Sequence, residues 1–352
     1  MKKFFYSLCK LAIGFLCLFI IILFLTPVFI PKFTKEFPTT AVMDGFYALP
    51  ENNIDILFLG SSQIMTSISP MRMYEQYGFT GYNLGTEQQN MVTSYYLLKE
   101  ALTYNPPRIV LLDVRFLFPY AQDYPLNSRE EFIRKSVDPM KWSSNKWEFI
   151  NTVCDLDSDQ KLQNYIFPFF RYHSRWADLS VQDITYLFQD KNNPLRGFSI
   201  SQRTETKDQF EGFSITDSST TTEALPTMEE YFYKIIDLCE TQNITLILFK
   251  TPMANGSFKE PEHNTVQKIA DEAGLVFIDF NEKSVYDAIN FRASSDYNDG
   301  THINYNGACK ITDYLADYLA NNYTLTDHRS SPDYAMWNDD LETYTQIINT
   351  LQ

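Results

Sequence analysis

Glycine and cysteine are both scarce in this chain of 352 residues. The 12 glycines are few for such a length, and none of them belongs to a phosphate-cradling loop. The five cysteines are scattered and include no Cys-x-x-Cys pair, so the sequence contains no disulfide framework and no metal-ligand spacing. We therefore expect neither a cofactor nor a metal ion.

Positive charge is scarce too. Lysine and arginine number 29 against 44 aspartates and glutamates, which gives a formal net charge of −15 at pH 7. This balance argues against nucleic acid and against an anionic lipid surface as partners. An acidic domain of this kind is most often simply a soluble one.

One long hydrophobic run is present, near the N-terminus. An uncharged apolar stretch over residues 11–30 follows three lysines. Twenty helical residues at about 1.5 Å each span roughly 30 Å, the thickness of the hydrocarbon core of a bilayer. The exit "LTPVFIPKF" has no small-x-small cleavage pattern. These features predict a cytoplasmic tail (1–10), a transmembrane signal anchor (11–31) and an extracytoplasmic remainder from Lys32 onwards. A long cleaved signal is the alternative.

Short apolar runs then alternate with helical patterns. The runs are "IDILFLG", "GYNLG", "RIVLLDV", "ITLILFK" and "LVFIDF", with "NMVTSYYLLKEALTYN", "TMEEYFYKIIDLCETQN" and "EHNTVQKIADEAG" among them. Continuous apolar strands separated by helices indicate a parallel sheet covered on both faces. We expect a linker over 32–53, then a three-layer, doubly wound, mainly parallel α/β domain over 54–325.

Two segments depart from this alternation. Residues 120–225 are rich in aromatic and charged side chains, which predicts an insertion that acts either as a lid over the strand ends or as structural decoration. Residues 326–352 predict a C-terminal helix whose apolar stripe packs back on the domain or docks to a partner. That stripe comprises Trp337, Leu341, Tyr344, Ile348 and Leu351.

The first strand ends in a serine-containing turn. In "IDILFLGSSQIMTS" (54–67) the apolar run stops at Gly60, and Ser61 and Ser62 follow. A serine at the carboxyl edge of such a sheet sits beside an exposed backbone N–H, which suits a nucleophile whose attack creates an oxyanion. Taken alone, Gly-Ser-Ser is also a common turn.

A base and an orienting carboxylate occur near the other end. In "SSDYNDGTHINYNGA" (294–308), Asp299 precedes His302 by three positions in a polar loop that leads into a helix. This spacing allows the carboxylate to reach one imidazole nitrogen and leaves the other free to take a proton from a serine. We therefore predict a catalytic triad of Ser62, His302 and Asp299.

These two blocks resemble those of the SGNH or GDSL-type hydrolases. Gly60, Ser61 and Ser62 match the family's Gly-Asp-Ser block, with Ser61 where the aspartate usually stands, and Asp299 to His302 match its Asp-x-x-His block. The Gly-Ser-Ser variant and the N-terminal anchor are similar to the DltD-like branch, whose namesake acts in D-alanylation of lipoteichoic acid. The resemblance covers roughly residues 54–322.

The middle blocks of the family are altered here. The oxyanion glycine of the second block corresponds to Gly85 or to a position near Gln88, so the resemblance implies an oxyanion hole from the backbone N–H groups of Ser62 and of Gly85 or Gln88. The third block, Gly-x-Asn-Asp, is missing, and Asp113 and Arg115 occupy its region. The oxyanion hole must therefore be built differently or be weaker.

Three further residues are candidates for substrate binding. His173 and Arg175 lie in the cationic and aromatic stretch "RYHSRWADLS", which suits a phosphate-bearing or sugar polymer or serves only as salt bridges. Lys250 ends the strand "ITLILFK" at the sheet edge where ligands bind, although a strand-end lysine is often merely solvated.

The resemblance implies a membrane-anchored extracytoplasmic serine esterase or acyltransferase. Its expected substrate is a cell-envelope polymer, a teichoic acid or polysaccharide carrying O-acetyl or D-alanyl groups, and a membrane-bound O-acyltransferase is the expected partner. The alternative is a catalytically weak accessory protein that binds such a polymer or partner. A substrate-binding receptor would fit the sheet but would give no reason for the Asp-x-x-His block.

Overall fold

The computed structural model describes residues 2–32, 39–121, 123–205, 210–254 and 256–351. Its centre is a five-stranded sheet in the order β2-β1-β3-β4-β5, with every neighbouring pair parallel. The strands are β1 (Ile56–Leu59), β2 (Gly81–Asn83), β3 (Ile109–Asp113), β4 (Thr245–Lys250) and β5 (Val276–Asp279). This confirms the predicted parallel α/β fold, and all five strands come from the predicted apolar runs.

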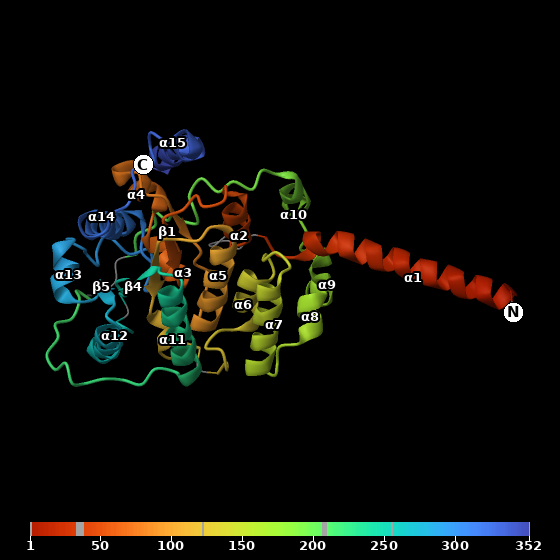
Figure 1. Cartoon of the computed structure of the whole chain (residues 1–352), viewed down its shortest axis with the longest axis horizontal. Helices are drawn as coiled ribbons and strands as arrows, with labels where there is room; N and C mark the ends of the chain where they lie inside the picture. Colours follow the sequence, from red (N-terminus) through yellow and green to blue (C-terminus); the bar gives the residue numbers. More distant parts are fainter. Residues whose placement is uncertain (1, 33–38, 122, 206–209, 255, 352) are drawn as a thin grey trace.

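The sheet is covered on both faces, as continuous apolar strands require. Along β1, Ile56 and Phe58 pack in one core and Leu57 and Leu59 in the other, because successive side chains point to opposite faces. The first core is shared mainly with α13 (Lys283–Ala288) and α14 (Tyr305–Asn322). The second is shared with α5 (Met91–Tyr104), α11 (Pro226–Thr241) and α12 (Glu260–Ala273), and Figure 1 shows the resulting layers.

Between β3 and β4 the described residues form helices and loops but no strand of the sheet. The elements are η1 (Arg115–Leu117), α6 (Glu130–Val137), α7 (Ser144–Leu156), α8 (Leu162–Ile166), α9 (Pro168–Tyr172), η2 (His173–Ala177), α10 (Val181–Thr185) and η3 (Tyr186–Phe188). α6 and α7 pack beside α5, whereas α8 to α10 lie at the side of the molecule from which the N-terminal helix departs (Figure 1).

That N-terminal helix, α1 (Lys2–Phe29), extends away from the rest of the chain (Figure 1). Over Lys3–Phe29 it is long and apolar enough to cross a membrane, a test that a signal sequence also passes. The orientation of the anchor stays a prediction. Residues 33–38 of the predicted linker lie outside the described residues. The remainder includes α2 (Thr39–Ala48), which buries Val42, Met43 and Phe46 in the core.

The chain ends in η4 (Pro332–Tyr334) and α15 (Ala335–Leu351), which packs on α4 (Pro70–Tyr77). Trp337 is fully buried, and its indole N–H donates to the Asn53 side chain at 2.5 Å. The buried Arg196 guanidinium lies 4.3 Å from the Trp337 ring and pairs with Asp340. The predicted stripe therefore packs back on the domain, except at its end, where Leu351 is 38% exposed.

Replacing Trp337 by alanine should destabilise the chain strongly. Loss of a buried tryptophan costs about 3–5 kcal/mol in free energy of unfolding, and here the stacked Arg196 would also lose its cover. Trp147→Ala is the matched control because Trp147 is 46% exposed, and an exposed substitution changes stability by no more than about 0.5 kcal/mol. Urea unfolding of the full chain in detergent measures both. Equal losses would mean that α15 is not a structural part of the core.

Candidate active site

The turn after β1 is set by a close approach between two strand ends. Gly60 has φ +154°, and a Cβ at this position would lie 2.5 Å from the Cβ of Asp113 at the end of β3. Only glycine fits there. The next residue, Ser61, caps α3 (Ser62–Ser67): its hydroxyl accepts from the backbone N–H of Gln63 at 3.4 Å and donates to Asp113 Oδ2 at 3.3 Å. Ser61 is therefore buried and structurally occupied.

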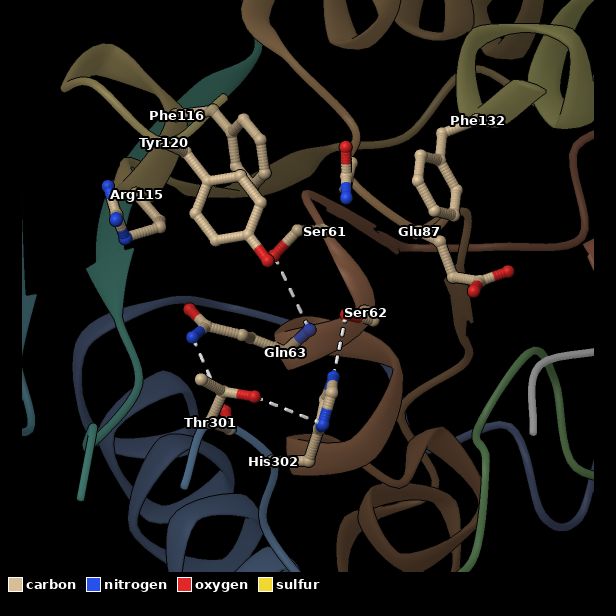
Figure 2. Close-up of a pocket in the computed structure, with 11 residues that line it drawn as sticks. Ser61, Ser62, Gln63, Glu87, Arg115, Phe116, Tyr120, Phe132, Thr301 and His302 are labelled. Carbon is tan, nitrogen blue, oxygen red and sulfur yellow. Dashed lines mark hydrogen bonds between the residues drawn. The ribbon is translucent and has the colours of Figure 1, made fainter. Parts of the chain in front are cut away.

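The side chain of Ser62, the first residue of α3, points toward His302. Its Oγ lies 2.8 Å from Nε2 of His302, although the two residues are 240 positions apart in the sequence (Figure 2). His302 stands in the loop before α14, and α3 and α14 pack against each other. The packing of these helices therefore brings the serine and the histidine together.

Asp299 completes the arrangement. Its Oδ2 lies 2.8 Å from Nδ1 of His302, and its Oδ1 accepts from the backbone N–H groups of Thr301 and His302 at 2.8 and 2.9 Å. Burial alone would raise the pKa of Asp299, but the hydrogen bond from His302, the imidazole charge and these backbone donors hold that pKa well below its usual value. An ionised carboxylate only accepts, so in the neutral imidazole Nδ1 carries the proton and Nε2 is left to accept from Ser62.

The three side chains lie where the strand order reverses. In the order β2-β1-β3-β4-β5 the chain crosses from β1 to β2 on one side and returns to β3 on the other, and ligands of open α/β sheets bind at this switch point, beyond the carboxyl ends of the strands. A cavity of about 140 Å³ is present here. Its lining consists of Ser61, Ser62, Gln63, Glu87, Gln88, Arg115, Phe116, Tyr120, Phe132, Thr301 and His302.

The two candidates for the second oxyanion donor are placed differently. Gln88 lines the cavity with φ +50°, an uncommon backbone conformation for a residue with a side chain. The N–H of Gly85 instead donates to the side-chain oxygen of Asn83 at 3.0 Å, and Gly85 does not line the cavity. This corrects the expectation for Gly85, because its donor is already used to shape the loop after β2.

Arg115 stands where the third block of the family would be. It follows β3 directly, lines the cavity, and lies with its guanidinium carbon 5.3 Å from the Tyr120 ring. Its Nε is buried without a hydrogen-bond partner among the described residues, and burial lowers the pKa of the guanidinium. Sequence reasoning assigns no role to Arg115. Its position two residues after the end of a parallel strand is the sequence feature that could have identified it as a cavity residue.

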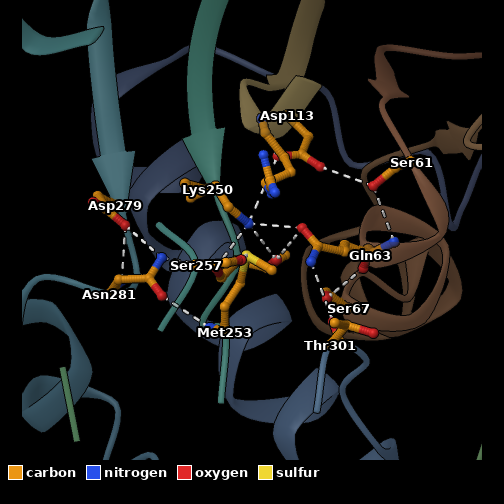
Figure 3. Close-up of polar contacts among 12 residues, drawn as sticks. Ser61, Gln63, Ser67, Asp113, Lys250, Met253, Ser257, Asp279, Asn281 and Thr301 are labelled. Carbon is orange, nitrogen blue, oxygen red and sulfur yellow. Dashed lines mark hydrogen bonds and ion pairs between the residues drawn. The ribbon is translucent and has the colours of Figure 1, made fainter. Parts of the chain in front are cut away.

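Lys250 is inside the protein rather than in the cavity. It is fully buried, and its ammonium donates to Gln63 Oε1 at 2.7 Å and to Thr251 Oγ1 at 3.1 Å (Figure 3). Burial lowers the pKa of Lys250 to about 8, although the Asp113 carboxylate 3.9 Å away opposes this effect. This corrects the prediction of direct substrate binding. The sequence places Lys250 correctly at the end of a strand, but whether its side chain is buried depends on packing against distant segments.

The contacts of Lys250 lead instead to the loop that contains Thr301 and His302. Gln63 accepts from Lys250 and donates through its Nε2 to the carbonyl oxygen of Thr301 at 3.3 Å (Figure 3). Thr301 directly precedes His302. The end of β4 thus supports the histidine loop through one buried side-chain amide.

His173 and Arg175 lie away from the cavity. Nδ1 of His173 lies 2.9 Å from the carbonyl oxygen of Phe170, and the Arg175 guanidinium bonds the carbonyl oxygen of Phe29 and, at 3.2 Å, the carboxylate of Asp183. Their partners belong to the end of α1 and to the insertion itself, so they lie apart from Ser62, and the binding of a polymer by these two residues stays a prediction.

No group of three or more His, Cys, Asp or Glu that could hold a metal ion occurs among the described residues. What the cavity does contain is a serine hydroxyl aligned on an imidazole nitrogen, with a carboxylate on the other nitrogen. This arrangement can perform nucleophilic acyl chemistry, because the base and its orienting group are within hydrogen-bond reach. The catalytic roles of Ser62, His302 and Asp299 stay a prediction.

Comparison with known proteins adds little to this geometry. No family model matches the chain. No curated protein matches it either. Among solved structures, a protein from Bacteroides fragilis described as a "putative acylhydrolase" matches with 11% identity and a TM-score of 0.36, over 80% of this chain and 94% of its own. At this level of similarity, function has to be argued from the site itself.

The lowered pKa of Asp299 makes a prediction about acid stability. The folded chain releases the Asp299 proton more readily than the unfolded chain, whose value is near the ordinary 3.8. The stabilisation is therefore present in full above about pH 4–5 and is lost as the pH falls towards the lowered value. The difference in free energy of unfolding between wild type and Asp299→Asn should be constant near neutral pH and shrink in acid. Urea titrations at a series of pH values measure it; a difference that does not change with pH would contradict the assigned ionisation.

Proposed function

We propose that the protein is a membrane-anchored serine esterase or acyltransferase that acts on the acyl groups of cell-envelope polymers through an acyl-serine intermediate. The observation that carries this proposal is the hydrogen-bonded series from Ser62 through His302 to Asp299, of which Ser62 and His302 line a cavity at the switch point of the sheet. The contacts of the buried Ser61 hydroxyl with Asp113 and with the first turn of α3 favour Ser62 over Ser61 as the nucleophile.

In the first step Ser62 Oγ attacks the carbonyl carbon of the bound ester while Nε2 of His302 takes the hydroxyl proton. Asp299, ionised and bonded to Nδ1, stabilises the imidazolium that forms. The tetrahedral oxyanion would accept hydrogen bonds from the backbone N–H groups of Ser62 and Gln88. His302 then returns the proton to the departing alcohol oxygen, the ester bond breaks, and the acyl group stays on Ser62.

In the second step His302 takes a proton from the acceptor, water or a polymer hydroxyl, which attacks the acyl-serine. Ser62 leaves with that proton, and the acid or the new ester is released. The resemblance to the DltD-like branch and the apolar helix α1 favour an acceptor or donor at the membrane surface. O-acetyl and D-alanyl esters of teichoic acid or polysaccharide are the proposed substrates, with a membrane-bound O-acyltransferase as the proposed partner.

An activity-based probe tests the nucleophile directly. A fluorophosphonate should label the wild-type chain, because an imidazole 2.8 Å from Ser62 Oγ makes this hydroxyl reactive. Labelling should be lost in Ser62→Ala and in His302→Ala. It should persist in Ser61→Ala, the matched control one position away. In-gel fluorescence after short exposure measures all four chains.

The outcomes separate the alternatives. Labelling that is lost only in Ser61→Ala would mean that the other serine is the nucleophile. An unlabelled wild type with a cooperative unfolding transition would contradict the enzyme and favour the accessory protein that binds an envelope polymer or an acyltransferase.

A common acyl-serine intermediate makes a second, kinetic prediction. Phenyl acetate and p-nitrophenyl acetate differ in leaving group but give the same acetyl-serine, so hydroxylamine and water should divide the acetyl group in the same ratio for both esters. Both products should fall by at least about 10³-fold in Ser62→Ala. Measuring hydroxamate and acetate side by side checks this. A ratio that depends on the leaving group would contradict the covalent intermediate.

A further inference from the structure

The end of α1 is held firmly by the rest of the chain. The Arg175 guanidinium donates to the carbonyl oxygen of Phe29, and the buried Lys32 ammonium donates to the carbonyl oxygens of Ile30, at 2.8 Å, and Val28, at 3.2 Å. The last carbonyls of a helix have no partner within the helix. Lys32 caps the helix from the residues that follow it, and Arg175 joins the helix end to the domain.

The segment that contacts α1 reaches well along it. We call residues 167–188, which run from the start of α9 to the end of η3, the collar. The ring of Phe29 lies 5.2 Å from that of Phe169, and the ring of Phe19 lies 6.1 Å from that of Phe167. Phe19 precedes Phe29 by ten residues, which corresponds to about 15 Å along a helix axis.

The contacts of Phe167 and Phe169 with α1 determine how deep the collar lies in a bilayer that α1 crosses. The hydrocarbon core is about 30 Å thick. None of the residues in the most apolar stretch of α1 is buried by the rest of the chain. If the span ends near Phe29, then Phe19 lies about 15 Å inside the lipid. Its neighbour Phe167 must follow it below the membrane surface.

The collar is built for such a position. Five large apolar side chains are exposed on it, among exposed polar residues such as Ser180 and Gln182: Phe170 (57% exposed), Trp176 (74%), Val181 (75%), Ile184 (52%) and Phe188 (85%). Of its charged residues, Asp183 is buried and pairs with Arg175 at 3.2 Å, whereas Asp178 is exposed. Exposed aromatic and aliphatic side chains around a helix exit are typical of the interface region of a membrane.

The geometry points to the collar as a membrane-embedded surface: we propose that residues 167–188 lie in the lipid of the bilayer that α1 crosses, with Trp176 and Phe188 among the acyl chains. Apolar immersion holds the collar there, so the net negative charge of the chain does not oppose it. This proposal requires that α1 is retained, and it is independent of the chemistry at Ser62.

The collar also has a rigid connection to the helix beside the candidate site. Tyr172, at the end of α9, donates to Asp138 at 2.6 Å and accepts from the buried Arg134 of α6 at 3.0 Å. The next residue of α6, Lys135, pairs with Glu87 of the cavity lining. An embedded collar would therefore hold the cavity at a set height above the membrane.

Tryptophan fluorescence in lipid tests this directly. The chain has four tryptophans, and Trp337 is fully buried, so it gives a constant background. In the full chain, Trp142→Phe with Trp147→Phe leaves Trp176 as the exposed reporter. Trp142→Phe with Trp176→Phe leaves Trp147, on α7, as the matched control. Both chains are placed in vesicles of phosphatidylcholine whose acyl chains are brominated, since bromine quenches only tryptophans that it touches.

We expect the Trp176 chain to lose most of the emission of its exposed reporter, and the Trp147 chain to match its emission in unbrominated vesicles. Equal emission of the Trp176 chain in both kinds of vesicle would overturn the proposal. Quenching of Trp147 as strongly as Trp176 would overturn it too, because the domain would then contact lipid without a defined face. Adding Ser62→Ala to either chain should leave the quenching unchanged, which separates this test from that of the proposed enzyme.

Discussion

The contact between the ends of β1 and β3, at Gly60 and Asp113, is the constraint on which the rest of the site depends. It leaves no room for a side chain at Gly60, and it brings the Asp113 carboxylate to the hydroxyl of Ser61. That hydroxyl also accepts from the first turn of α3, whose first residue is Ser62. The same carboxylate accepts from the Arg115 N–H and offsets part of the charge of the buried Lys250. The Asp113 carboxylate thus contacts polar groups at the ends of three strands, β1, β3 and β4.

The polar groups around the proposed triad form two connected parts. Asp299 and the backbone donors of its loop fix the imidazole of His302 from one side. Gln63, held by Lys250, supports the carbonyl of Thr301 from the other. Burying an ammonium is expensive, as the lowered pKa of Lys250 reflects. A buried cation of this kind persists where its hydrogen bonds position other groups, and here they lead to the loop of the candidate base.

The segment between β3 and β4 serves both ends of the molecule. Its beginning supplies Arg115, Phe116 and Tyr120 to the cavity, and its collar surrounds the end of α1. In the cationic and aromatic stretch, Arg175 bonds the end of the N-terminal helix and Trp176 projects outward, while the binding of a polymer by this stretch stays a prediction.

Local pattern by itself determined the parallel sheet, the N-terminal apolar helix and the pairing of Ser62 with Asp299 and His302 as candidates. Apolar runs, strand-end residues and an Asp-x-x-His spacing are properties of neighbouring positions. Only the tertiary structure decided that Gly85 uses its N–H on Asn83, that Lys250 is buried, and that Arg115 faces the cavity. Each of these depends on contacts between segments distant in the chain. The same residue type at a strand end can be solvated, buried or turned to a ligand, and packing alone selects among them.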